Sequence, residues 1–167
     1  MDYERKELEV YRQGKVLSDQ FYIDDDYNVP DARSDVKNVI LGEGSLNIED
    51  MRIQDSYIRV SGKLIFKVLY ASDEEPARIC ALEGRIPFEE MVYMEEPCEG
   101  NLFVKDVQTD LTVTVIHSRK LNIKTFVELQ ISSQDRNGIT LTTDADADFP
   151  IYKKYRKQEL LNLFTVK

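Results

Sequence analysis

"YIRVSGKLIFKVLY" (residues 57–70) is the stretch that decides the fold class of this chain. Its even positions are apolar apart from one glycine, whereas its odd positions include Arg59 and two lysines. The even set is Ile58, Val60, Gly62, Leu64, Phe66, Val68 and Tyr70. A period of two over fourteen residues is typical of a long antiparallel strand with one buried and one wet face.

The segment before this strand also alternates, but its phase changes. Leu46 and Ile48 are apolar in one phase, and the apolar residues of 51–53 follow in the opposite phase. An extra residue at Glu49–Asp50, which is a β-bulge, produces such a change. We therefore predict a bulged strand that is joined to the next strand by a turn at Asp55–Ser56.

Four further strands are predicted downstream. They cover residues 79–86, 110–117, 120–132 and 139–149, with a polar loop at 71–78 and a tight turn at Ser118–Arg119.

Two connections complete this part of the chain. Residues 86–101 are interpreted as a mixed connection, because Pro87 and Pro97 interrupt any strand there. The residues Arg136-Asn137-Gly138 predict a three-residue hairpin loop with a left-handed glycine, a register that keeps the apolar residues on one face.

A short helix is predicted in "NVPDARSDVKNVILG" (28–42). Pro30 starts a turn, and Asp31 can cap the first free N–H groups of a helix. Val36, Val39 and Ile40 follow at helical spacing, and Gly42 is a typical terminator. The expected helix covers about residues 32–41.

The two ends of the chain are less regular. For residues 1–28, helix and strand both remain open, although Leu17 to Ile23 favours a strand. Near the other end, a basic cluster at 153–157 precedes "ELLNLF" (159–164), which predicts a terminal helix with one apolar face. That helix would either bind a partner or a membrane surface, or cover an open edge of the domain.

Together these patterns predict a mainly β fold, an antiparallel β-sandwich-like domain with one short helix (about 32–41) and a candidate C-terminal helix. We expect residues 29–150 to form the β domain. Residues 1–28 would be an N-terminal segment that can supply a strand of the same domain. Residues 151–167 would be a helix or a linker to a further module.

Composition narrows the classes of partner. A net charge of −9 disfavours binding to duplex nucleic acid or to an anionic membrane, because both need a basic surface. The start "MDYERKELEV" has no apolar region like that of a signal peptide, and no apolar run reaches transmembrane length. With two cysteines only, we expect a cytoplasmic protein with free thiols.

No group of residues has the pattern of a catalytic, cofactor or metal site. "DADAD" (144–148) lacks the glycine and the final acid of a calcium loop, and His117 is the single histidine. Pairs of acids are numerous by chance among thirty-one acidic residues. We therefore predict no catalytic residue, cofactor or metal. The candidate interaction residues are Asp144, Asp146, Asp148, Tyr155, Leu160, Leu163 and Phe164.

Four segments in order resemble the SPOCS domain of clostridial sporulation proteins such as SipL. They are "VPDARSDVKNVI" (29–40), "VSGKLIFKVLY" (60–70), "IPFEE" (86–90) and "SRKLNIKTFVEL" (118–129). The family usually carries Lys-Pro-Asp where this chain has Arg33-Ser34-Asp35. Many members continue into a LysM module, which nothing in this chain resembles.

The resemblance implies a non-enzymatic protein-interaction module that takes part in spore coat or cortex assembly. Its implied partner is a SpoIVA-like spore coat morphogenetic protein, and its implied location is the mother-cell cytoplasm at the forespore surface. Self-association through sheet edges is also allowed.

Two rival functions remain open. A carbohydrate- or peptidoglycan-binding β-sandwich would need aromatic platforms, for which Tyr57, Tyr70 and Tyr93 are candidates. A hydrolase with paired carboxylates would need a concave pocket that holds two facing acids.

Overall fold

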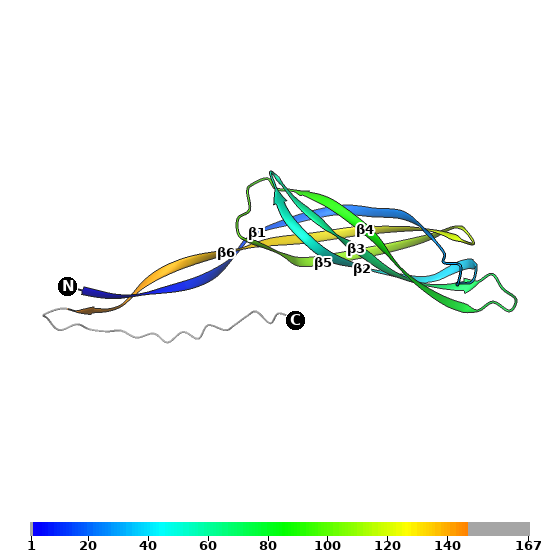
Figure 1. Cartoon of the computed structure of the whole chain (residues 1–167), viewed down its shortest axis with the longest axis horizontal. Helices are drawn as coiled ribbons and strands as arrows, with labels where there is room; N and C mark the ends of the chain where they lie inside the picture. The colour runs from blue at the N-terminus through cyan, green and yellow to red at the C-terminus, as the bar shows by residue number, and fades with distance from the viewer. Residues whose placement is uncertain (1, 147–167) are drawn as a thin grey trace. The chain divides into compact units, whose positions relative to one another are not determined.

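The computed structural model of the chain describes residues 2–146, and Figure 1 shows that these residues form long strands joined by turns and loops. The strands are β1 (Asp2–Asn28), β2 (Val36–Gln54), β3 (Tyr57–Ser72), β4 (Ile79–Tyr93), β5 (Asn101–His117) and β6 (Lys120–Asp146). Within residues 2–146 there is no helix, and hence none that could cross a membrane.

The strands form two three-stranded sheets, one in the order β1-β6-β5 and the other in the order β2-β3-β4. The pairs β2–β3, β3–β4 and β5–β6 are antiparallel. The fold class predicted from the sequence, mainly β with an antiparallel sandwich-like arrangement, is therefore confirmed.

One hydrophobic core joins the inner faces of the two sheets. The even positions of β3 are buried, as the period of two predicts, and they meet the buried odd positions of β6 such as Leu121 and Leu129. The bulge between Ile48 and Asp50 and the turns at Asp55–Ser56 and Ser118–Arg119 are also confirmed.

Thr125 places a hydroxyl among these buried side chains of β6. Its Oγ1 has no hydrogen-bond partner among the described residues. A buried hydroxyl without a partner loses its hydrogen bonds to water on folding and gains none in return. Thr125→Val should therefore raise the free energy of unfolding by about 1 kcal/mol. Urea unfolding measures this gain, and an equal or lower stability of the variant would contradict it.

The predicted helix at 32–41 is wrong. Asp31 and Ala32 form a turn, and β2 begins at Val36. At the start of β2 the register with β3 shifts twice, between Val36 and Asn38 and between Val39 and Leu41. Each shift adds one residue between inward-facing side chains, so these recur every third residue and not every second. This spacing resembles that of a helix.

Two other predictions at strand ends are also wrong. The chain does not turn at Arg136-Asn137-Gly138, because β6 continues through these residues and has β1 as its neighbour in the sheet. Similarly, β4 continues through Pro87 to Tyr93. Because β4 is the end strand of its sheet, a proline without an N–H group is tolerated there.

The chain divides into two compact units, one made of residues 1–10 and 137–167 and the other of residues 11–136. In the smaller unit, the structure describes residues 2–10 and 137–146, which belong to β1 and β6. The hydrophobic core and the groove described next belong to the larger unit. The boundaries expected at residues 28 and 150 stay predictions.

Candidate functional site

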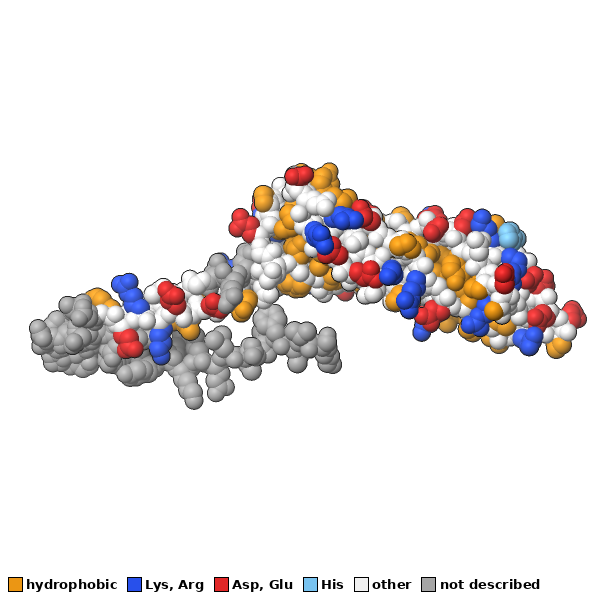
Figure 2. All heavy atoms as spheres, viewed as in Figure 1, with side chains coloured by type: hydrophobic (Ala, Val, Ile, Leu, Met, Phe, Trp, Pro, Cys, Tyr) orange, Lys and Arg blue, Asp and Glu red, His pale blue; other side chains and the backbone are white. Residues whose placement is uncertain are grey.

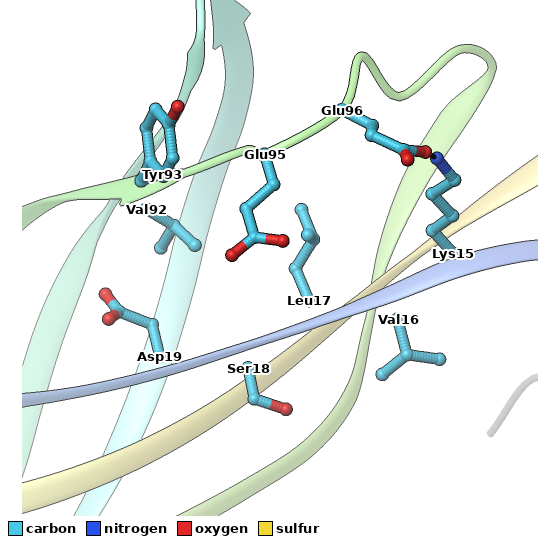
Figure 3. A pocket seen from close by; sticks show the side chains of 9 residues that line it. All are labelled: Lys15, Val16, Leu17, Ser18, Asp19, Val92, Tyr93, Glu95 and Glu96. Carbon is cyan, nitrogen blue, oxygen red and sulfur yellow. Dashed lines mark ion pairs between the residues drawn. The ribbon is translucent and has the colours of Figure 1, made fainter.

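A groove of about 640 Å³ lies between β1 and the end of β4. Residues 15–19 of β1 form one wall, and residues 92–96 contribute the other. Met94 fixes this second wall, because its N–H donates to the carbonyl of Ser56 at 2.8 Å. Figure 3 shows the side chains of Asp19 and Glu95 pointing into the space between the two walls. The groove has the size of a site for a small ligand or a short peptide.

One wall belongs to β1, and the other begins at the end of β4 and continues into the connection that carries Glu95 and Glu96. β1 and β4 are the end strands of their sheets in the described part of the chain. In an end strand, every second residue directs its N–H and C=O groups to the outer edge, where no neighbouring strand pairs with them. The groove therefore lies where main-chain donors and acceptors are available for an extended ligand.

Further along the same two strands, aromatic side chains fill the space. Phe21 of β1 stacks on Phe88 of β4 with ring centroids 5.9 Å apart. Tyr27 packs edge-on against Phe66 at 4.9 Å, and its hydroxyl donates to the carbonyl of Glu83 at 3.4 Å. Residues 15–19 carry no aromatic side chain, so the space stays open beside them.

The other pair of end strands, β2 and β5, approaches closely. Thr109 donates its hydroxyl to the carbonyl of Gly44 at 2.8 Å. A Cβ added at Gly42 would lie 2.9 Å from Cγ2 of Val113, so a glycine is what lets the two strands approach at this point. The groove of about 640 Å³ lies on the opposite side, between β1 and the end of β4.

The groove is acidic. Its lining contains the carboxylates of Asp19, Glu95 and Glu96 and a single cation, Lys15, which forms an ion pair with Glu96. Within residues 2–146, neither Asp19 nor Glu95 forms an ion pair. The groove therefore carries negative charge that the described part of the chain does not neutralise.

A further carboxylate, Glu90, lies on the inner side of β4. It shares the parity of the buried residues Ile86 and Val92 and is itself half-buried. Burial raises the pKa of Glu90 above its ordinary value, and the negative charge of Asp19 raises it further, against a smaller lowering by a hydrogen bond from the Met91 backbone. Charged groups from both walls thus interact at this end of the core.

The raised pKa of Glu90 makes stability depend on pH. Since the folded chain binds this proton more tightly than the unfolded chain, the ionised carboxylate lowers stability at neutral pH. Glu90→Gln should therefore unfold at higher urea concentration than the wild type at neutral pH. The difference should shrink as the pH falls through the raised folded-state pKa towards the ordinary value.

Glu89 is the matched control with the opposite sign. Its pKa is lowered, chiefly by the hydrogen bond from Arg59 at 2.6 Å. Glu89→Gln should therefore lose stability at neutral pH, and this loss should vanish as the pH falls through the lowered pKa. A change of stability in the same direction in Glu90→Gln and Glu89→Gln would contradict the opposite pKa shifts of the two carboxylates.

Two tyrosines lie beside one another at the neighbouring ends of β3 and β4. Tyr57 and Tyr93 are exposed, and their rings meet at 60° with centroids 5.4 Å apart. Tyr93 also lines the groove. Tyr70 is not available as a sugar platform, because it is fully buried and donates its hydroxyl to the carbonyl of Ser34 at 2.9 Å.

Arg119, in the turn between β5 and β6, holds the segment that precedes β2. Its guanidinium donates to the carbonyls of Val29, Pro30 and Arg33 at 3.0, 2.9 and 2.6 Å, and to the carboxylate of Asp35 at 3.1 Å. The Val29 N–H donates in return to the carbonyl of Arg119 at 2.9 Å. A hub of this kind gives residues 29–35 a fixed conformation without a helix.

Arg119→Ala should lower the free energy of unfolding by about 2–3 kcal/mol, because several carbonyls lose a charged donor at once. Arg119→Lys should recover only part of this loss, since an ammonium group cannot span the same set of acceptors. Urea unfolding measures both. Arg59→Ala is the control, because Arg59 pairs with the exposed carboxylate of Glu89 and should lose only the small stability of one surface ion pair. Equal effects at the two positions would contradict the role of Arg119.

The residues predicted as an interaction site stay a prediction. Asp144 and Asp146 belong to β6. The remaining candidates, Asp148, Tyr155, Leu160, Leu163 and Phe164, lie outside the described residues. The groove itself was missed. A usable signal was the placement of Asp19 and Glu90 at inward-facing positions of otherwise apolar alternating runs.

Other potential reactive groups are separate from the groove. In residues 2–146, no cluster of three histidine, cysteine, aspartate or glutamate side chains could hold a metal ion. His117 is a hairpin residue, as predicted, and its Nδ1 accepts a hydrogen bond from the Arg119 N–H at 3.1 Å. Cys80 and Cys98 are both free thiols.

Comparison with known proteins gave one family. The model of the SipL SPOCS domain matches residues 35–118, which is just over half of the chain. Searches of the curated proteins and of the solved structures gave no match. The match covers β2 to β5 and the first residue of the turn that carries Arg119, and it includes one wall of the groove. The chain belongs to the SipL SPOCS-domain family.

Proposed function

We propose that this chain is a non-enzymatic protein-interaction module in the assembly of the bacterial endospore envelope, its coat or cortex. Its family indicates a sporulation-related interaction role. The observation that carries the proposal is the acidic groove between the edges of β1 and β4. Open strand edges are a common means by which proteins bind extended segments of other proteins.

Membership in this family supports a proposal about the partner and the location. We propose a SpoIVA-like spore coat morphogenetic protein as the partner and the mother-cell cytoplasm at the forespore surface as the location. Nucleic acid is not a proposed partner. Figure 2 shows acidic and basic side chains interspersed on the visible face, without a uniformly basic surface.

The test uses the full chain fused to a fluorescent protein in a sporulating host. The fusion should gather at the forespore surface during engulfment, and affinity capture at that stage should recover coat or cortex proteins. A diffuse signal in the mother cell, with no envelope protein captured above the level of the fluorescent protein alone, would contradict the proposal.

A second candidate is binding of peptidoglycan, which the exposed pair Tyr57 and Tyr93 at the groove favours. Aromatic rings are the side chains on which sugar rings commonly pack. The two rings are inclined at 60°, however, and so do not form one flat platform. Sedimentation with purified peptidoglycan tests this candidate. Binding that is lost in Tyr57→Ala and Tyr93→Ala would favour it over the first proposal.

The same incubation tests for hydrolysis, because Asp19 and Glu95 are two acids that point into one groove. We expect no release of soluble sugar fragments. Release that disappears in Asp19→Asn would assign an enzymatic role instead.

A further inference from the structure

We infer that the groove binds an extended peptide segment that carries lysine or arginine, and that this segment adds as a strand to the outer edge of β1. This inference rests on the proposed role as a protein-interaction module. It commits to one kind of occupant, a basic segment of another protein.

The choice of β1 follows from the lengths of the two walls. β1 runs from Asp2 to Asn28 and contributes five consecutive residues, 15–19, to the groove. β4 ends at Tyr93 and contributes only its last two residues before the connection begins. Only β1 therefore offers a continuous row of main-chain groups along the groove.

The preference for a basic segment follows from the charges. A strand added beside β1 places every second side chain on the side of Asp19, which interacts electrostatically with Glu90. Glu95 points into the same space from the other wall. A neutral or acidic segment would leave these carboxylates desolvated without a cation, whereas lysine or arginine would pair with them.

The apolar part of the groove fits the same side chains. Leu17 is half-buried and Val92 is 2% exposed, and both line the groove beside the acids. Lysine and arginine carry a hydrocarbon stem that can cover such residues while the charged end reaches a carboxylate.

A second copy of this chain is a poorer occupant. The chain has a net charge of −9, and two acidic surfaces repel each other. The chain also contains a basic cluster at 153–157, so self-association is one of the outcomes that the experiment distinguishes.

The experiment presents the full chain to an array of random peptides of about eight residues, which is the length of an ordinary strand. Bound peptides should be enriched in lysine and arginine, with spacing of two between the basic positions. The tightest peptide is then titrated against the wild type and against the double variant Asp19→Asn, Glu95→Gln. Affinity for the double variant should fall about tenfold or more, and wild-type binding should weaken as salt is added.

Asp110→Asn is the matched control, because Asp110 is an exposed acid on β5 and does not line the groove. Its affinity should equal that of the wild type. Amide hydrogen exchange on the bound complex should slow at residues 15–19, which reports strand addition to β1 directly. Thermal unfolding confirms that each variant is folded before it is titrated.

Three results would overturn the inference. They are enrichment of acidic or purely apolar peptides, an affinity that the double variant leaves unchanged, and slowed exchange that excludes residues 15–19. Concentration-dependent self-association that the double variant abolishes would assign the groove to a second copy instead.

The outcome is separable from that of the proposed function. If basic peptides bind in the groove but the fluorescent fusion stays diffuse, the sporulation role fails and the inference about the groove stands. If the fusion localises and the double variant localises equally well while no peptide binds, the module acts through another surface.

Discussion

Replacing Phe66 with alanine is expected to lower the free energy of unfolding by about 4 kcal/mol, the largest effect of any single substitution considered. The Phe66 side chain is fully buried at the centre of β3. Its ring lies on Gly84 of β4, so that even a Cβ at this glycine would collide with it, and it meets the edge of Tyr27 from β1. The residue therefore joins three strands that belong to both sheets.

Urea unfolding measures this loss, provided that the variant is folded in the absence of urea. Phe103→Ala is the control, because Phe103 is 36% exposed on β5 and its removal should cost less than about 1 kcal/mol. Removal of the ring leaves a cavity beside Tyr27 of β1 and Gly84 of β4. Amide hydrogen exchange should therefore accelerate more at residues 21–27 than in β5. Equal losses in the two variants would show that Phe66 does not hold the sheets together.

Gly62→Ala is expected to lower the free energy of unfolding by about 3 kcal/mol, although it adds only one methyl group to β3. Gly62 lies between Ile48 of β2 and Phe88 of β4. A Cβ here would collide with the carbonyl of Asn47 and lie 2.9 Å from Cα of Ile48. These are backbone atoms next to the bulge of β2, so no rotamer change can relieve the contact.

Gly138→Ala is the matched control for this substitution. Among the described residues, a Cβ at Gly138 has no heavy atom within 4 Å, and β6 continues through this position. The variant should be as stable as the wild type or slightly more stable, because alanine restricts the unfolded chain. A clear loss of stability would instead support the left-handed glycine of a hairpin turn at 136–138.

These two glycines illustrate how far local sequence can be interpreted. Asn-Gly is a strong turn signal, yet residues 137 and 138 lie within β6. The reason is that β1 takes the neighbouring place in the sheet, which no local pattern at residues 136–138 contains. At Gly62 no local signal indicates the need for a glycine, because it lies within an apolar alternating run. The close contact with Asn47 and Ile48 exists only because β2 pairs with β3.

The candidate site divides in a similar way. The charged residues Asp19 and Glu90 stand out at inward-facing positions once each strand is aligned, so part of the groove was present in the sequence. That they influence one another follows only from the folded chain. The hub around Arg119 is likewise invisible locally, because its acceptors lie more than eighty positions away in the sequence.

The sequence by itself determined the buried faces of the strands, since alternation over residues 57–70 and 120–132 specifies which side chains point inward. It also determined the tight turns at Asp55–Ser56 and Ser118–Arg119. Only the tertiary structure decided that Val36 to Leu41 form a bulged strand and not a helix, and that the open groove lies between β1 and β4. The physical reason is that burial follows from local periodicity, whereas strand partners and the gaps between sheets depend on segments that are distant in the chain.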